Sequence, residues 1–185
     1  MKIDLLLAAI TNTLQKTKVD KLALIVANEG IVITDLIDLT FHKDQKIGFR
    51  AAWILEQVYI QRQNDFLSSV PYFLEKFTIQ NNLSARRHFA KILALLTHKN
   101  APRPIKDLVD NYDVDELIAI TFNWLIDEKV PVAIKSHCLN ILANFSFRQQ
   151  WIKEELLQTI NFLIDKESIG FYAKVKQIKK QLARS

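Results

Sequence analysis

Glycine is scarce in this sequence, and its scarcity excludes several classes of fold. Gly30, Gly48 and Gly170 are the only glycines among 185 residues, and there are four prolines. A β-sandwich or a doubly wound α/β fold uses many more glycines in its turns, and a phosphate-binding loop needs a glycine cluster. The composition therefore indicates a helical protein.

Cysteine and long apolar runs are also rare. Cys138 is the only cysteine, which excludes an internal disulfide and a multi-cysteine zinc site and is typical of a reducing compartment. No stretch approaches the roughly 18 apolar residues of a membrane span. The apolar run from Leu5 to Ile10 follows Asp4 and is too short for a signal peptide. We therefore expect a cytoplasmic protein that does not enter the membrane.

Excess positive charge is confined to the C-terminal end. The chain carries 25 lysines and arginines against 20 aspartates and glutamates, a net charge of +5. Residues 168–185 contain no acid and all five excess cations, which are Lys174, Lys176, Lys179, Lys180 and Arg184. A basic C-terminal helix could touch phosphates. The favoured interpretation is a solvated cap whose cations complement the negative end of the helix dipole.

Helical periodicity recurs along the whole chain, without convincing strand alternation. The predicted helices span residues 21–28, 31–40, 47–59, 64–78, 83–97, 105–110, 114–127, 131–146, 150–165 and 169–184. Pro71 is expected to open a turn or to kink the helix over 64–78. The repeated order of helix, short loop and helix indicates stacked helical hairpins.

Superposing four of these helices reveals a repeat. Segments that begin at Ile47, Ala85, Ile134 and Phe171 share one register, with offsets of 38, 49 and 37 residues. Three apolar columns then read Ile54, Ile92, Ile141 and Ile178; Ala51, Phe89, Cys138 and Val175; and Val58, Leu96, Phe145 and Leu182. A fourth column, Leu55, Leu93 and Leu142, breaks at Lys179, as expected of a terminal repeat without a following neighbour. Offsets of 37 and 38 residues are the length of two helices and two turns. The longer offset of 49 residues contains an insertion marked by prolines.

The second helices of these hairpins resemble those of HEAT and armadillo repeats. Residues 48–55 (GFRAAWIL) and 85–93 (ARRHFAKIL) place a basic residue early and an aliphatic pair late. The chain is also similar to short bacterial HEAT-like proteins. The resemblance implies an all-α fold, a right-handed α-α superhelix of about four to five stacked helical hairpins with an N-terminal helical cap. We expect one domain over residues 1–185, with the cap at 1–30 and repeat units at about 31–62, 63–98, 105–148 and 149–185.

Ligands of such solenoids usually bind the concave face, which the second helices line. The register places polar columns beside the apolar ones on these helices. The candidate partner-binding residues are Arg50, Trp53, Arg86, Arg87, His88, Lys91, Lys135, His137 and Asn140. Such a ridge could meet an acidic peptide or a phosphate backbone through charge-assisted hydrogen bonds. The alternative interpretation is that these are only the solvated faces of amphipathic helices.

Motifs for catalysis or metal binding are not found. The four histidines include no pair with the spacing of metal ligands, and Cys138 lies in an apolar column. Acidic residues cluster around the insertion at Asp107, Asp110, Asp113, Asp115 and Glu116. They could bind a cation or act as acid and base, but the favoured role is to cap the helix that begins near Val114. We therefore predict no catalytic residue, no metal and no cofactor.

A non-enzymatic interaction module is the leading functional hypothesis, with an unidentified protein or an acidic peptide as its partner. Trp53 would supply apolar contact, and the neighbouring cations would supply orientation. The alternative is a nucleic-acid-binding protein related in fold to DNA-alkylation glycosylases, which are also built from HEAT-like repeats. That relationship implies an essential aspartate on the concave face, where these columns offer none and the nearest acid is Glu56. A third hypothesis is a homo-oligomer whose concave face is filled by its own copy.

Overall fold

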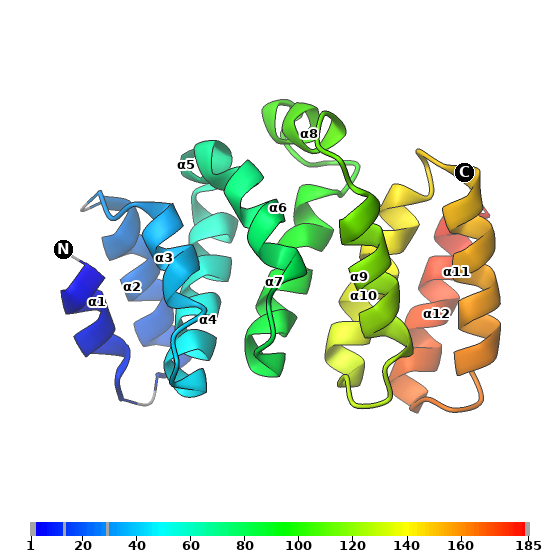
Figure 1. The fold of residues 1–185 in the computed structure, drawn as a ribbon, viewed down its shortest axis with the longest axis horizontal. Coiled ribbons are helices and arrows are strands. Elements are labelled where there is room, and N and C mark those ends of the chain that lie inside the picture. Colours follow the sequence, from blue (N-terminus) through cyan, green and yellow to red (C-terminus); the bar gives the residue numbers. More distant parts are fainter. Residues whose placement is uncertain (1–2, 13, 29, 184–185) are drawn as a thin grey trace. The chain divides into compact units, whose positions relative to one another are not determined.

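The regular structure of this chain is helical (Figure 1). The computed structural model describes residues 3–12, 14–28 and 30–183, and none of these lies in a β-strand. In chain order the helices are α1 (Ile3–Ile10), α2 (Lys16–Asn28), α3 (Ile33–Leu39), α4 (Gln45–Gln61), α5 (Gln63–Phe66), the 3-10 helix η1 (Leu67–Ser69), α6 (Val70–Thr78), α7 (Leu83–Leu96), α8 (Arg103–Asp110), α9 (Asp115–Ile126), α10 (Val132–Phe145), α11 (Gln150–Leu163) and α12 (Ile169–Leu182). No helix within the described ranges is both long and apolar enough to cross a membrane.

The chain divides into two compact units. The N-terminal unit covers residues 1–92 and the C-terminal unit covers residues 93–185, so that α7 contributes to both. The repeat boundaries given above stay a prediction.

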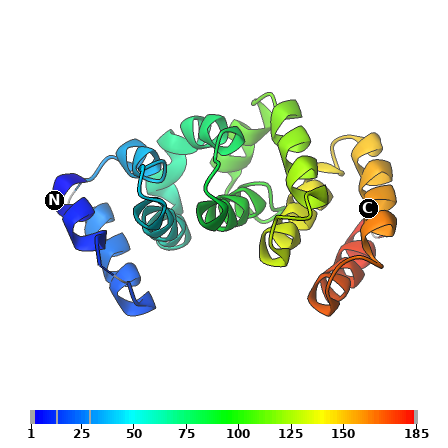
Figure 2. The same ribbon diagram turned by 60° about the horizontal axis from the view of Figure 1, so that its bottom comes forward.

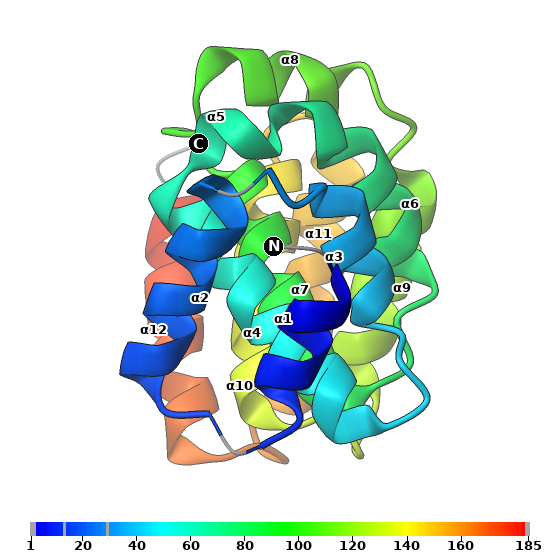
Figure 3. The same cartoon turned by 90° about the vertical axis from the view of Figure 1, so that its left-hand side faces the viewer.

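Helix α4 is the centre of the N-terminal unit. It packs against α1, α2 and α3, which surround it when the unit is viewed from the N-terminal end (Figure 3). Its apolar side chains, among them Ile54 and Leu55, are fully buried. Phe73 on α6 and Phe89 on α7 lie with their ring centroids 5.0 Å apart. This aromatic contact joins α6 to α7.

Helix α10 has the corresponding place in the C-terminal unit. It packs against α9, α11 and α12. Figure 2 shows the C-terminal hairpin, α11 and α12, in orange and red. Because α10 is surrounded by three helices, most of its apolar residues are completely buried, including Cys138.

The buried columns confirm the register predicted from the sequence. Each residue of the three apolar columns is at most 2% exposed, and Lys179, where the fourth column breaks, is exposed. Most predicted helix boundaries lie within two residues of the observed ones. Three differences stand out: α1 was not predicted as a helix, α2 begins five residues before the predicted helix over 21–28, and the predicted helix over 64–78 is divided into α5, η1 and α6. Pro71 lies in the first turn of α6, where a missing N–H does not break the helical hydrogen bonds.

Candidate functional site

Two arginines of the predicted ridge stabilise the fold of the N-terminal unit. The Nη1 group of Arg50 donates to the carbonyl oxygens of Ile10 at 2.9 Å and Thr11 at 2.7 Å, at the end of α1. The Nε group of Arg86 donates to the carbonyl oxygen of Gln80 at 2.7 Å, in the loop before α7. These contacts satisfy carbonyl groups that lack a helical partner. Both guanidinium groups are therefore already engaged within the chain.

Glu56 forms a polar cluster with two residues of the ridge, His88 and Lys91. Its Oε1 accepts from Lys91 Nζ at 2.6 Å, and its Oε2 lies 2.6 Å from His88 Nδ1. Burial raises the pKa of Glu56, but the hydrogen bonds and the charge interactions with His88 and Lys91 together outweigh burial and hold this pKa below its ordinary value. Glu56 and His88 are almost completely buried. His88 therefore lies in the interior of the unit.

Trp53 lies at the edge of this cluster. Its ring stacks on His88, with centroids 6.3 Å apart and planes 17° apart, and lies 6.0 Å from the ring of Phe49. Trp53 is partly buried, whereas Arg87 on the neighbouring helix is exposed. Arg87 is thus the exposed cation of the ridge predicted in this unit, and Trp53 lies partly accessible on α4.

In the C-terminal unit the predicted residues are dispersed. Lys135 is 1% exposed and forms an ion pair with Glu167, so it lies in the interior of the unit. His137 and Asn140 are partly buried. Burial lowers the pKa of Lys174.

The remaining basic residues of α12 face solvent. Lys176 lies over the ring of Tyr172, with its Nζ 4.7 Å from the ring centroid. Lys180 is exposed and lines a pocket. Of the basic residues predicted on this helix, Lys180 is therefore the one that the fold brings together with other cations.

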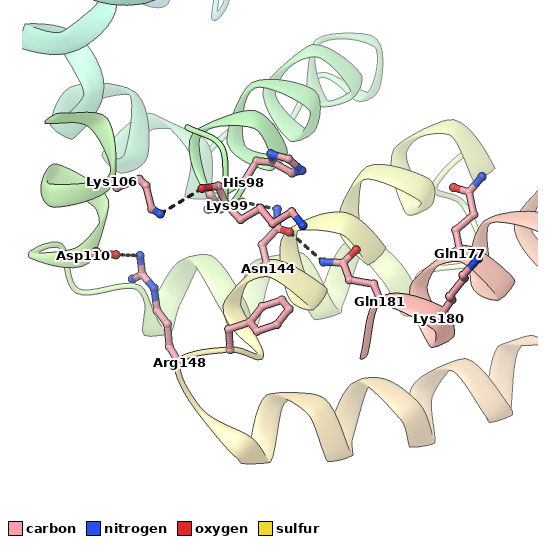
Figure 4. A pocket seen from close by; sticks show the side chains of 11 residues that line it. His98, Lys99, Lys106, Asp110, Asn144, Arg148, Gln177, Lys180 and Gln181 are labelled. Carbon is pink, nitrogen blue, oxygen red and sulfur yellow. Dashed lines mark hydrogen bonds and ion pairs between the residues drawn. The ribbon is translucent and has the colours of Figure 1, made fainter. Parts of the chain in front are cut away.

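This pocket is formed by four segments of the C-terminal unit (Figure 4). It has a volume of about 570 Å³ and lies between the end of α7, α8, the end of α10 and α12. Its lining residues are Thr97, His98, Lys99, Lys106, Asp110, Asn144, Phe147, Arg148, Gln177, Lys180 and Gln181. We call it the basic pocket.

The basic pocket has an excess of positive charge. Lys99, Lys106, Arg148 and Lys180 line it together with a single carboxylate, Asp110. Arg148 forms an ion pair with Asp110 and also donates to the carbonyl oxygen of Val109 at 3.3 Å. Lys106 Nζ donates to the Lys99 carbonyl oxygen at 3.2 Å. The net charge of these five side chains is +3, so the pocket attracts anions.

A network of amides gives the basic pocket its shape. Asn144 Nδ2 donates to the Ala94 carbonyl oxygen and to Thr97 Oγ1, each at 3.1 Å, and Asn144 Oδ1 accepts from Gln181 at 3.3 Å. Asn144 thus joins the C-terminal end of α7 to α12. Beside this network Phe147 is 54% exposed, which leaves an apolar surface next to the cations.

Three of the four pocket cations were not predicted from the sequence. Lys99, Lys106 and Arg148 lie in the α7–α8 connection, on α8 and after α10, outside the columns of the second helices. The sequence feature that could have indicated these cations is the long offset between the second and third repeats. It marks an insertion, and an insertion adds side chains at one end of a repeat.

The acidic cluster of the insertion has mixed roles. Asp113 Oδ1 accepts from the Asp115 N–H at 3.2 Å, which agrees with the predicted role at the start of α9. Asp110 pairs with Arg148, and Asp107 Oδ1 accepts from Arg103 Nε at 2.9 Å. No group of three or more metal-ligating side chains was found in the part of the chain that the structure describes.

Comparison with known proteins gives the family. A family model described as a HEAT repeat domain matches residues 6–182. No curated protein and no solved structure matches the chain. The match extends over nearly the whole chain and confirms the all-α HEAT-like fold class expected from the repeat register. The chain therefore belongs to the HEAT repeat domain family, whose repeats generally serve as scaffolds for protein interactions.

Proposed function

We propose that this chain is a non-enzymatic interaction module that binds an acidic segment of a partner protein in the basic pocket. The observation that carries this proposal is the gathering of Lys99, Lys106, Arg148 and Lys180 around an exposed phenylalanine, with one carboxylate among them. As its compartment we propose the cytoplasm, on the basis of the cysteine usage of the sequence.

The side chains of the basic pocket suit an acidic peptide. Carboxylates of a partner would accept charge-assisted hydrogen bonds from the lysines and from Arg148. Phe147 and the alkyl parts of the lysines would contact an apolar residue of the same segment. The excess positive charge would also raise the association rate at low ionic strength.

The basic pocket is built partly from second helices, on which the sequence predicts partner binding. Helices α10 and α12 are the second helices of their hairpins, and both contribute to it. Trp53 and Arg87 lie on α4 and α7, which are second helices of the N-terminal unit. We propose them as contacts of the N-terminal unit for a protein partner.

The test uses a fluorescein-labelled peptide of glutamate, leucine and phenylalanine, with binding followed by fluorescence anisotropy. The double variant Lys99→Glu/Lys180→Glu should weaken binding by about a hundredfold, because two favourable charges become repulsive. Lys176→Glu is the matched control, since Lys176 lies on the same helix but does not line the pocket; its effect should stay within about threefold.

A labelled single-stranded oligonucleotide is tested in parallel, to distinguish peptide binding from the alternative function, nucleic-acid binding. Oligonucleotide binding that is tighter than peptide binding, and that weakens steeply with salt, would replace the proposal with nucleic-acid recognition. Equal loss of peptide affinity in Lys176→Glu would show that net charge matters and that the basic pocket does not. Sedimentation of the chain without peptide measures its oligomeric state and so tests the third hypothesis, a homo-oligomer.

A further inference from the structure

A second cavity in the C-terminal unit lies between α9 and α11, the first helices of their hairpins. Its volume is about 540 Å³. Its lining includes Asp115, Ile118, Phe122 and Ile126 on α9, with Trp151 and Glu155 on α11. We call it the α9–α11 groove. None of its lining residues lines the basic pocket.

Large apolar side chains of the groove are open to solvent. Trp151 is 49% exposed and Ile126 is 48% exposed, whereas Trp124 on α9 is buried. Trp151 Nε1 donates to Gln149 Oε1, so the indole N–H is satisfied while the ring remains accessible. A half-exposed tryptophan in a cavity is typical of a residue that anchors a protein partner.

The charge of the groove is opposite to that of the basic pocket. Its lining includes the carboxylates of Asp115 and Glu155 and no lysine or arginine. The carboxylates therefore stand beside apolar side chains without a cation among the lining residues. A partner that buries its own apolar residues here would be favoured if it carried lysine or arginine next to them.

The spacing of the lining residues fits a helix. On α9 they recur at Asp115, Ile118, Phe122 and Ile126, which is one face of that helix. Eleven positions at the rise of an α-helix give the groove a length of about 16 Å, or about three helical turns. Grooves of apolar side chains between two helices accept the apolar face of a third helix.

We propose that the α9–α11 groove binds a basic amphipathic helix of a partner protein. Apolar anchors of that helix contact Phe122, Ile126 and Trp151, and its lysines or arginines pair with Asp115 and Glu155. This site is independent of the basic pocket, because the two share no residue and select opposite charges.

The experiment uses a labelled synthetic peptide of leucine and lysine, with leucines spaced to form one face of a helix. Binding is followed by fluorescence anisotropy. Two control peptides are included, one with the same residues in scrambled order and one with glutamate in place of lysine. The amphipathic basic peptide should bind at least about tenfold more tightly than either control, because it alone supplies both the apolar face and the cations.

Variants then locate the site. Trp151→Ala should weaken binding by about tenfold or more, and Glu155→Lys should weaken it by about fivefold through charge reversal. Phe162→Ala is the matched control, because Phe162 is on the same helix and 61% exposed but does not line the groove. The Phe162→Ala variant should bind the amphipathic basic peptide with unchanged affinity. Thermal melting checks that each variant is folded.

Three results would overturn the proposal. The first is scrambled peptide that binds as tightly as the amphipathic one. The second is an equal loss of affinity in Phe162→Ala and Trp151→Ala, or the absence of any binding of the amphipathic basic peptide to the parent chain. The third is a sedimenting dimer that Trp151→Ala converts to a monomer, since the groove would then be occupied by a second copy of this chain. The Lys99→Glu/Lys180→Glu variant should bind the basic peptide normally, which separates this proposal from the proposed function.

Discussion

The backbone of Gly48 approaches the backbone of Thr40 closely. A Cβ added at Gly48 would lie 2.6 Å from the Thr40 carbonyl oxygen and 3.3 Å from Asn82 Nδ2. The first distance is far below an ordinary contact, and the oxygen belongs to the backbone, so it cannot rotate away. Gly48 therefore allows the start of α4 to pack against the end of α3.

Substitution of Gly48 should be costly although glycine disfavours a helix. Alanine would gain up to about 1 kcal/mol from helix propensity, but overpacking against Thr40 costs about 1–3 kcal/mol or more. We expect Gly48→Ala to lower the free energy of unfolding by about 1–2 kcal/mol net in urea titrations. Gly170→Ala is the control, because the nearest atom there is Ser168 Oγ at 3.7 Å. A Gly48→Ala variant as stable as Gly170→Ala would contradict the close approach.

Acid should remove the stabilisation that Glu56 provides. The pKa of Glu56 in the folded chain lies below the ordinary value of 4.5. Its contribution is therefore complete above that value and is lost as the pH falls through the lower, folded pKa. Glu56→Gln should reduce the free energy of unfolding by about 2 kcal/mol at neutral pH, and the difference from the parent chain should shrink in acid.

Urea titrations at several pH values measure this difference. Glu75→Gln is the control, since Glu75 is an exposed residue of the same unit and its charge should matter little. A stability difference for Glu56→Gln that does not change between neutral and acidic pH would rule out the ionised carboxylate as its source.

The Lys135–Glu167 pair should respond unequally to the loss of its two members. Lys135 is completely buried, whereas the side chain of Glu167 is 17% exposed. Glu167→Ala strands a buried ammonium group and should cost about 3 kcal/mol or more. Lys135→Met retains the side-chain volume and leaves a carboxylate that can turn to solvent, so it should cost about 1 kcal/mol. Equal losses in urea titrations would contradict this asymmetry.

Most of the fold could be predicted from the sequence because the repeat signal is local. The spacing of Ile54, Ile92, Ile141 and Ile178 requires only helical periodicity and a repeated length, and all four residues are buried. The helix over 64–78 was less accurate. Phe66 on α5 and Phe73 on α6 pack together across the division, and a single proline does not specify that contact.

The candidate site was harder to predict because its members meet through packing. The sequence identified Lys180 and the side chains near Glu56, but it did not indicate that Glu56 itself lies buried between His88 and Lys91. That contact depends on the packing of α7 against α4. Lys99 and Arg148 line the same pocket because the insertion folds beside the end of α10. The assignment of the ridge residues to a partner stays a prediction.

Asp110 should reduce the affinity of the basic pocket for acidic peptides, because it pairs with Arg148 inside the pocket. Asp110→Asn removes one repulsive charge and frees the guanidinium group. We expect affinity for the acidic peptide to rise about twofold to fivefold, and the gain to fall at higher salt. Asp107→Asn is the control in the same anisotropy assay, since Asp107 pairs with Arg103 and does not line the pocket. Unchanged affinity in Asp110→Asn would place the acidic peptide elsewhere.

Cys138 is completely buried on α10, the helix that also carries Asn144. A thiol reagent can reach its sulfur only when the C-terminal unit opens. Because the sequence contains no other cysteine, the rate of alkylation measures that opening in the unlabelled chain. A ligand that fastens the end of α10 to α12 will slow alkylation, so the protein carries its own chemical reporter of occupancy.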